Sequence, residues 1–232
     1  MTPALLAEAM EATWPAAAVR DQGPFRLREG DGGGQRVSAV SVTGDFSAAD
    51  LEALGEPALF VVYPGRSAAD DALDAALKAR GYALHDPVLA YAAPVAALAG
   101  ELPDLVAFPH WPPLETTRAI WAEGGIGPGR IRVMERAAGP KTVILARSDD
   151  RPSGAAFVAC HQGLAMLHAV EVRAARRRQG VGGHLLRAAA NWAADQGADR
   201  LALVVTARNL AARALYDRTG MQVVGQYHYR RK

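Results

Sequence analysis

The chain has 232 residues, half of them apolar, and its 26 basic and 24 acidic side chains leave a formal net charge of +2. This length allows one large domain or two small ones, and the balanced charge excludes a general polyanion-binding protein. The single cysteine, Cys160, excludes a disulfide framework and a multi-cysteine zinc site, so we expect a cytoplasmic protein without a metal.

The sequence also lacks the signals of a membrane or exported protein. No apolar run reaches the ~18 residues of a membrane span, and no basic segment precedes an apolar one at the start. We expect a soluble monomer or homodimer without a membrane partner.

The first part of the chain predicts a compact α/β unit. Periodicity and turn residues predict, in order, a helix (4–14), two strands around a glycine-rich tip (25–29 and 35–42), a helix capped by Ser47 (46–54), a buried strand (58–64), a helix ended by Gly81 (67–82) and a strand (83–94). A stretch rich in alanine and proline follows, so we place a domain boundary there and predict domains over 1–98 and 99–232.

The second part predicts an α/β fold with a mixed sheet. Its expected elements are a helix (114–125), three strands (141–148, 153–162 and 164–172), a helix (183–197), a strand (200–207), a helix (210–220) and a final strand (222–232). Segments 73–82 and 212–221 are both a helix end, a glycine and a strand start. They are either a decayed repeat or a chance likeness in an alanine-rich chain.

The segment "RRRQGVGGHLL" (176–186) joins a strand to a helix. A helix start exposes unpaired N–H groups and positive dipole charge, and glycine lets the backbone approach a ligand. The segment therefore predicts an anion cradle made of main-chain amides, with a tightly packed structural turn as the alternative.

Spacing excludes two other ligand types for this segment, and composition argues against a third. A dinucleotide fingerprint would need glycine where Leu185 stands, and the Gly-Lys-Ser/Thr of a triphosphate loop is absent from the chain. The arginine tract is short and lacks interleaved aromatic residues, so we expect no nucleic-acid partner.

Two motifs carry a family resemblance. Arg177, Gly180 and Gly182 fill a Q/R-x-x-G-x-G/A pattern, and a second segment has Asn209, Ala212, Leu215, Tyr216 and Gly220 in place. Together they resemble the GCN5-related N-acetyltransferase (GNAT) superfamily over roughly residues 100–232. One departure is Ala174, where the pattern often has proline.

The resemblance implies that acetyl-CoA is the donor and that it is held where two parallel strands separate. It also implies a GNAT-like mixed sheet, with residues 1–98 as a smaller α/β domain that is a degenerate half without a cofactor loop. It implies that Val170 and Val172 pair with the pantetheine arm and that Asn209 bonds it. The implied cofactor-binding residues are Val170, Val172, Arg177, Arg178, Gln179, Gly180, Val181, Gly182, Gly183, Asn209 and Ala212.

Transfer of an acetyl group to an amine needs a base for the amine and an acid for the thiolate. Tyr216 is our candidate acid, with packing on the cofactor as the alternative role. His168 is the first candidate base, because its segment is similar to that of aralkylamine N-acetyltransferases and its ordinary pKa suits neutral pH, with a structural, hydrogen-bonded histidine as the alternative. Glu171 is the second, although strand alternation predicts that it faces away from His168 and Val170.

Aromatic residues are candidates for an acceptor pocket. Tyr227, His228 and Tyr229 in the last strand could line it, and Trp111 and Trp121 could cover it, although all five could equally be structural. We therefore predict an acetyl-CoA-dependent N-acetyltransferase acting by direct attack of a primary amine, on a small molecule or a protein. The alternative is a non-catalytic acyl-CoA-binding or sensing module.

Overall fold

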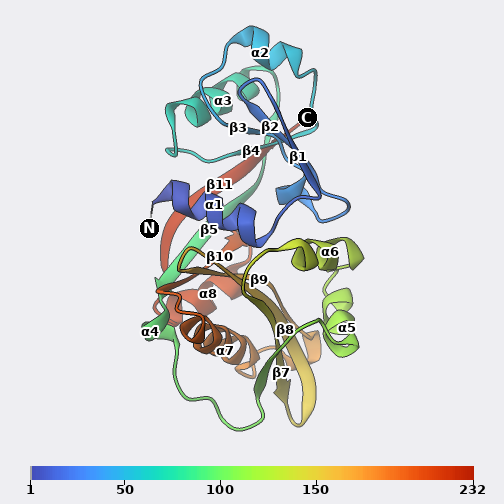
Figure 1. The fold of residues 1–232 in the computed structure, drawn as a ribbon, viewed down its shortest axis with the longest axis vertical. Helices are drawn as coiled ribbons and strands as arrows, with labels where there is room; N and C mark the ends of the chain where they lie inside the picture. Colours follow the sequence, from blue (N-terminus) through green and yellow to red (C-terminus); the bar gives the residue numbers. More distant parts are fainter. Residues whose placement is uncertain (1) are drawn as a thin grey trace.

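An eight-stranded mixed sheet organises the chain, of which the computed structural model describes residues 2–232 (Figure 1). Its strands, in spatial order, are β4 (Leu59–Val62), β11 (Gln222–Arg231), β5 (Ala83–Pro94), β10 (Arg200–Thr206), β9 (Leu164–Val172), β8 (Arg151–His161), β7 (Lys141–Ser148) and β6 (Ala107–His110). β9 and β10 run parallel, and the other neighbouring strands are antiparallel. The predicted GNAT-like mixed α/β sheet is confirmed.

Eight α-helices lie among the described residues and cover both faces of this sheet. They are α1 (Pro3–Thr13), α2 (Ala48–Ala53), α3 (Ala68–Ala79), α4 (Val95–Leu98), α5 (Glu115–Glu123), α6 (Pro128–Arg136), α7 (Val181–Asp195) and α8 (Leu210–Arg218). α4, α7 and α8 pack on one face of the strands, whereas α1, α5 and α6 pack on the other. Burial of apolar side chains in these layers is the main force holding them together.

A second, three-stranded sheet lies at one end of the molecule, beside α2 and α3 (Figure 1). It consists of β1 (Ala18–Gln22), β2 (Phe25–Glu29) and β3 (Ser41–Val42), and a single parallel bridge between Val40 and Phe60 connects it to β4. Ser47 and Asp50 form a reciprocal capping box at the start of α2, as the predicted N-cap requires.

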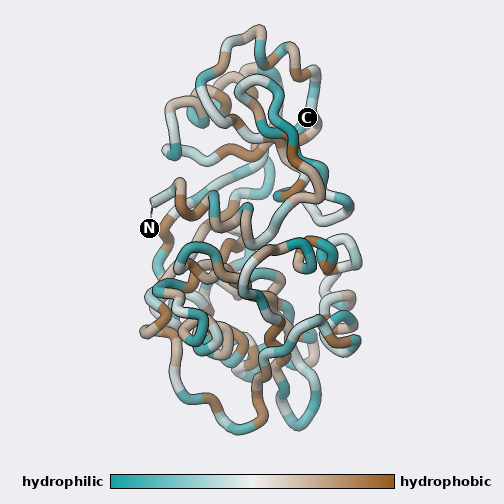
Figure 2. The backbone as a smooth tube through the Cα atoms, in the orientation of Figure 1, coloured by the Kyte–Doolittle hydropathy of each residue, from teal (hydrophilic) through white to brown (hydrophobic). Residues whose placement is uncertain are grey.

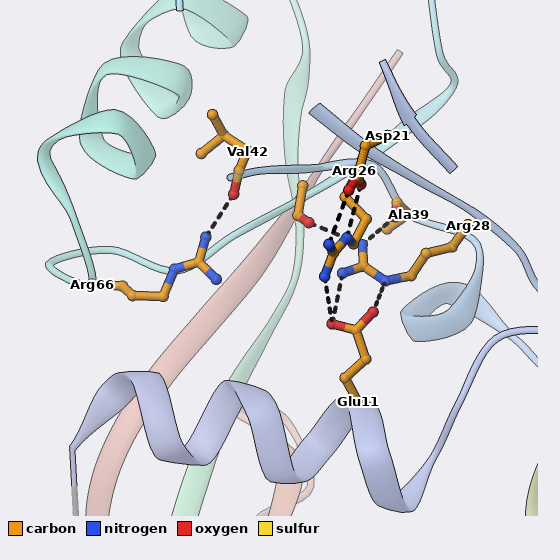
Figure 3. Close-up of polar contacts among 8 residues, drawn as sticks. Glu11, Asp21, Arg26, Arg28, Ala39, Val42 and Arg66 are labelled. Carbon is orange, nitrogen blue, oxygen red and sulfur yellow. Dashed lines mark hydrogen bonds and ion pairs between the residues drawn. The ribbon is translucent and has the colours of Figure 1, made fainter. Parts of the chain in front are cut away.

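Helix α1 connects the small sheet to the large one. Its buried side is apolar, and its tube in Figure 2 alternates between hydrophobic and hydrophilic stretches. On its polar side, Glu11 accepts a hydrogen bond of 3.1 Å from Arg28 of β2, which also donates to the Ala39 carbonyl (Figure 3). Arg66 donates to the Val42 carbonyl at 3.0 Å. The bonds of Arg28 fix the small sheet against the helix, and the bond of Arg66 fixes β3 to the loop that follows β4.

Several elements differ from the prediction. Segment 35–42 is a 3₁₀ turn (Gln35–Val37) followed by only the short β3, because the glycines before it, including Gly34 at a φ of 97°, turn the chain away from its neighbour. Helix α6 was missed because Gly127, Pro128 and Gly129 look like a loop, although Pro128 starts a helix that is stabilised by tertiary burial.

Three more elements escaped the prediction. β1 is an exposed strand without alternating apolar residues, and the short α4 and β6 lie in the alanine- and proline-rich stretch that we read as a boundary. Helix α7 begins at Val181, two residues before the predicted start, and it buries Leu185, Leu186 and Ala189 as expected.

The large sheet runs across the predicted boundary at residue 98. β5 precedes this boundary, yet it lies between β10 and β11, which follow it. The two similar segments are also structurally equivalent: Tyr82 N–H bonds the Leu77 carbonyl after α3, and Met221 N–H bonds the Tyr216 carbonyl after α8, each around a left-handed glycine. Both helix ends are therefore the same capping motif.

Candidate active site

The parallel strands β9 and β10 separate near the middle of the sheet. They pair from Leu164 opposite Arg200 to Leu167 opposite Leu203, and their pairing ends there, although β9 continues to Val172 and β10 to Thr206. One backbone edge of each strand is therefore free of a neighbouring strand over these last residues.

A bulge in β9 produces this separation. Ala169 has a φ of 51°, and the register with β8 shifts at this point, so that Ala155 lies opposite Glu171 and Phe157 opposite His168. The indole N–H of Trp121 donates to the Ala169 carbonyl at 2.8 Å and satisfies the polar group that the bulge exposes. Trp121 thus supports the bulge rather than covering a pocket.

The bulge also corrects the predicted orientation of Glu171. Because Ala155 and Phe157 are two residues apart in β8 and both face the α5 and α6 side, their partners Glu171 and His168 share that face. Simple alternation had placed these two side chains on opposite faces. Val170 and Val172 face the other side and pack against the α7 layer.

The loop before α7 has the geometry of an anion cradle. Arg178 and Gly180 have φ values of 65° and 82°, and Gly180 is the N-cap of α7 without any side-chain cap. Within residues 2–232, no backbone or side-chain acceptor receives the N–H groups of residues 178–182. Successive free amides at a helix start form a site for a phosphate or a comparable anion.

The glycines of this loop have different reasons to be small. A Cβ on Gly182 would lie 2.9 Å from Leu215 Cδ2, so Gly182 allows α7 to pack closely on α8. Gly183 faces open space, and Gly180 adopts a backbone conformation that other residues rarely take. The close approach of α8 places Tyr216 near the separated strands.

The arginines of the loop are only partly free. Arg176 pairs with Asp149, and Arg177 donates to Glu171 at 3.2 Å and, through Nε, to the Val172 carbonyl at 3.1 Å. Arg178 is exposed and forms no ion pair with the described residues. Gln179 accepts a hydrogen bond from Ser148 at 3.2 Å. Since Arg177 occupies the Val172 carbonyl, a ligand that pairs with this strand would have to use its other polar groups or displace Arg177.

Helix α8 carries Asn209, Ala212 and Tyr216. The Asn209 Oδ1 accepts the Ala212 N–H at 3.1 Å as the N-cap, which leaves its Nδ2 available as a donor. Tyr216 packs on Tyr91 with ring centroids 5.6 Å apart, and burial raises its pKa to about 12. Tyr216 is therefore protonated at neutral pH and able to donate.

His168 is buried in a polar contact between the two parts of the chain. Its Nε2 lies 2.8 Å from the Thr13 hydroxyl, its Nδ1 lies 3.3 Å from Arg36, and its side chain is 3 % exposed. Burial first, and the Arg36 charge second, hold its pKa well below the usual value, so the ring is neutral at pH 7. It does not line the cavity described next.

A cavity of about 370 Å³ lies beside the separated strands, on the α1 and α6 side of the sheet. Both strands contribute to its wall, through Ala169 of β9 and through Val204 and Thr206 of β10. Its other lining residues are Trp14, Gly33, Gly34, Gln35, Arg36, Asp86, Val88, Ile126, Arg130, Arg208, Tyr227 and Tyr229. The volume suits a small organic molecule.

The cavity includes two aromatic residues that the sequence had proposed. Tyr227 and Tyr229 line it, whereas His228 faces the other way and contacts Asp74 at 2.7 Å. Trp111 packs on Phe157, away from the cavity. The polar residues Gln35, Arg36, Asp86 and Arg130 were missed, since they come from a 3₁₀ turn, a strand and a helix start with no common motif.

Two features are absent from the described residues 2–232. No helix among them is long and apolar enough to span a membrane. No three of their histidine, cysteine, aspartate and glutamate side chains come together in a way that could hold a metal ion.

Comparison with known proteins agrees with this geometry. A sequence model described as the Acetyltransferase (GNAT) family matches residues 108–221. The chain is 26 % identical over 239 residues, 95 % of each chain, to the uncharacterized N-acetyltransferase YobR of Bacillus subtilis (strain 168).

Solved structures show the same fold. A GCN5-related N-acetyltransferase from Kribbella flavida superposes with a TM-score of 0.71 at 18 % identity, covering 100 % of this chain and 96 % of that chain. An acetyltransferase described as putative, from Novosphingobium aromaticivorans DSM 12444, gives a TM-score of 0.59 at 17 % identity, covering 91 % and 89 %.

Proposed function

The chain belongs to the GCN5-related N-acetyltransferase superfamily, and from this premise we propose that it transfers the acetyl group of acetyl-CoA to a primary amine by direct attack. The observation that carries the proposal is one juxtaposition. The free amides of residues 178–182 lie at the start of α7, directly after the strand that separates from its parallel neighbour. A pyrophosphate and an extended amide-bearing arm are the chemistry that such a site fits.

The residues on the α7 side fit the donor. The N–H groups from Arg178 to Gly182 would hold the pyrophosphate, with Arg178 adding charge at the rim. The free backbone edge at Val170 would pair with the pantetheine amides, and the Asn209 Nδ2 would donate to them. When bound there, acetyl-CoA supplies an activated acetyl thioester.

The reaction itself moves one acetyl group and one proton. The amine nitrogen attacks the thioester carbonyl carbon, the new C–N bond forms, the C–S bond breaks, and the amine proton leaves while the thiolate takes one up. Tyr216, with its pKa raised to about 12, is protonated and is our choice for the donor to the sulfur.

The amine must lose its proton first. At neutral pH this costs an alkyl amine about 4.6 kcal/mol, given an ordinary pKa of about 10.4. Asp86 is the carboxylate that lines the cavity, and we propose that it receives this proton. His168 and Glu171, the candidates from the sequence, lie outside the cavity lining, so we assign His168 a positioning role through Arg36.

Two measurements test this function. Isothermal titration with acetyl-CoA should show binding, and release of CoA thiol should depend on an added amine. Absence of acetyl-CoA binding would refute the proposal. Binding without thiol release across a broad amine panel would instead support the alternative of a non-catalytic sensing module.

The role of Tyr216 has its own test. Tyr216→Phe should lower kcat by about 100-fold, because it removes the proton donor, while the acetyl-CoA affinity stays nearly unchanged. Tyr91→Phe is the matched control, since Tyr91 packs against the same ring from the protein core. An unchanged kcat in Tyr216→Phe would show that another group protonates the thiolate.

A further inference from the structure

The charges that line the cavity are not balanced. Three arginines, Arg36, Arg130 and Arg208, and one carboxylate, Asp86, face it. Arg208 lies 3.4 Å from Asp86, so the charges of these two side chains neutralise each other. Arg36 and Arg130 form no ion pair with any of residues 2–232. Two positive charges therefore remain in a concave site.

Arg36 and Arg130 differ in this respect from two arginines nearby. Other arginines near the same region have acidic partners: Arg28 pairs with Glu11, and Arg66 pairs with Asp70. The backbone explains why Arg36 and Arg130 lie together, because a Cβ on Gly34 would be only 3.4 Å from Arg130 Nε, so glycine lets the guanidinium of Arg130 rest against the loop that carries Arg36.

Arg36 is held in place rather than free to move to solvent. Its guanidinium lies over the Trp14 ring, 5.6 Å from the centroid, and contacts His168 Nδ1 at 3.3 Å. Neither contact neutralises its charge, because His168 is buried with its pKa well below the usual value. A positioned guanidinium without a counter-ion binds a planar anion such as a carboxylate through two parallel hydrogen bonds.

The same cavity contains two buried acceptors without donors. Gln35 Oε1 and Asp86 Oδ1 are buried and receive no hydrogen bond from the described residues, since Arg208 is not aligned with Asp86 Oδ1 for one. Both residues line the cavity, and Gln35 Nε2 lies 3.2 Å from Nε2 of His85, the residue before Asp86. Because both side chains line the cavity and can accept hydrogen bonds, they are candidates to receive a bond from a bound amine.

We propose that the acceptor is a small amine that carries its own anionic group, of the α-amino acid type, with the anion held by Arg36 and Arg130 and the amino group by Gln35 and Asp86. This inference rests on the proposed acetyl transfer and names its substrate class. Trp14, Tyr227 and Tyr229 form the apolar part of the wall and would contact the rest of the molecule. Simple alkylamines and polyamines are disfavoured, because their positive charge meets two uncompensated arginines.

The test compares acceptors that differ only in the anion. Thiol release from acetyl-CoA is measured with α-amino acids, with the corresponding amino acid amides, and with aminoalkyl phosphates. At least one amino acid or aminoalkyl phosphate should have a kcat/KM about 30-fold or more above its uncharged counterpart. The two anionic series distinguish a carboxylate from a phosphate. Equal or faster turnover of uncharged amines, polyamines or peptide lysines overturns the inference and leaves the proposed function intact.

Variants assign the effect to the two arginines. Arg130→Gln and Arg36→Gln should each remove most of the preference for the anionic acceptor, by about 30-fold, while the acetyl-CoA affinity stays unchanged. Arg130 is the cleaner of the two, since it has none of the contacts of Arg36 with Trp14 and His168. Arg20→Gln, an exposed change on β1 of the same charge, is the control and should act like the wild-type protein. An equal loss for charged and uncharged acceptors would overturn the assignment.

A binding measurement covers the case in which no amine is acetylated. Saturation-transfer NMR of the amino acids with the whole protein and CoA should then show contact that Arg130→Gln abolishes. Such contact would support the anion site while the proposed function fails. Absence of contact for every anionic amine would overturn the site as well.

Discussion

His168 illustrates how the surroundings of a residue decide its role. In the sequence it stands at a position typical of a base in related enzymes, and its pKa is indeed displaced from the ordinary range. The displacement comes from burial among Thr13, Trp14 and Phe157 rather than from exposure to a substrate. A neutral imidazole in this place connects α1, the Arg36 loop and β9, three segments far apart in the chain.

The low pKa of His168 predicts a pH dependence of stability. Below about pH 6.5 the unfolded chain binds a proton at His168, whereas the folded chain does not. The free energy of unfolding therefore falls as the pH decreases, by at most about 1.4 kcal/mol per pH unit from this group. The contribution is fully present above that pH. His168→Asn should flatten the decline between pH 6.5 and 5, as measured by urea unfolding. Parallel profiles for the two proteins would contradict this account.

At the scale of elements, helix α7 has a left-handed glycine at each end. Gly180 precedes it with a φ of 82°, and Gly197 follows it with a φ of 73°. A Cβ at Gly197 would meet nothing within 4 Å, and one at Gly180 would meet only the His184 ring, at 3.9 Å. The two positions carry the same kind of backbone strain, but only Gly180 belongs to the proposed anion cradle.

This symmetry gives a matched pair of variants. Gly180→Ala and Gly197→Ala should each lower the free energy of unfolding by about 1–2 kcal/mol, because alanine is strained at a positive φ. Only Gly180→Ala should also weaken acetyl-CoA binding, by about tenfold, through the displaced amides. Titration calorimetry and urea unfolding measure the two effects. An equal effect on binding at both ends would mean that the cradle is not where the donor binds.

At the scale of the whole molecule, the two halves of the sequence share one sheet. We propose that residues 1–98 are a decayed copy of the acetyltransferase half, since β4–α3–β5 and β10–α8–β11 have the same order and the same helix ends. The copy has kept its strands and lacks a loop like that of residues 176–183. Its remaining contribution includes Trp14 at the end of α1, the Arg36 loop and Asp86, which form much of the cavity wall.

The shared sheet predicts what truncation does. A fragment of residues 99–232 lacks β5 and β4, so β10 and β11 lose the strand between them and expose apolar side chains such as Leu201, Leu203 and Tyr227. We expect this fragment to aggregate or to remain unfolded, because open apolar strand edges promote association. Circular dichroism and size-exclusion chromatography test this. A folded, monomeric fragment that binds acetyl-CoA would show that the boundary at 98 separates independent domains.

Local patterns were sufficient for most elements and for the two motifs of the proposed donor site. Ser47, Gly81 and the alternating strands act through neighbours a few residues away, and the loop from Arg177 to Gly183 with Asn209 and Tyr216 is a contiguous pair of motifs. Such features can be recognised from the sequence alone, because capping, turn geometry and helix periodicity depend on residues that are close in the sequence. The family and the mixed α/β class follow from them.

The geometry of the proposed acceptor side was decided only by tertiary structure. The bulge at Ala169 places Glu171 and His168 on the same face, whereas simple alternation had separated them. This bulge could not be predicted from the preference of any single residue, because a distant tryptophan stabilises it. The insertion of β5 between β10 and β11 brings Asp86 next to Arg208, and the glycine loop brings Arg36 to Arg130. The sequence by itself thus determined the loop that we propose as the donor cradle, since its amides are adjacent along the chain. The cavity that we propose for the acceptor joins residues more than a hundred positions apart, so only packing of the two halves could form it.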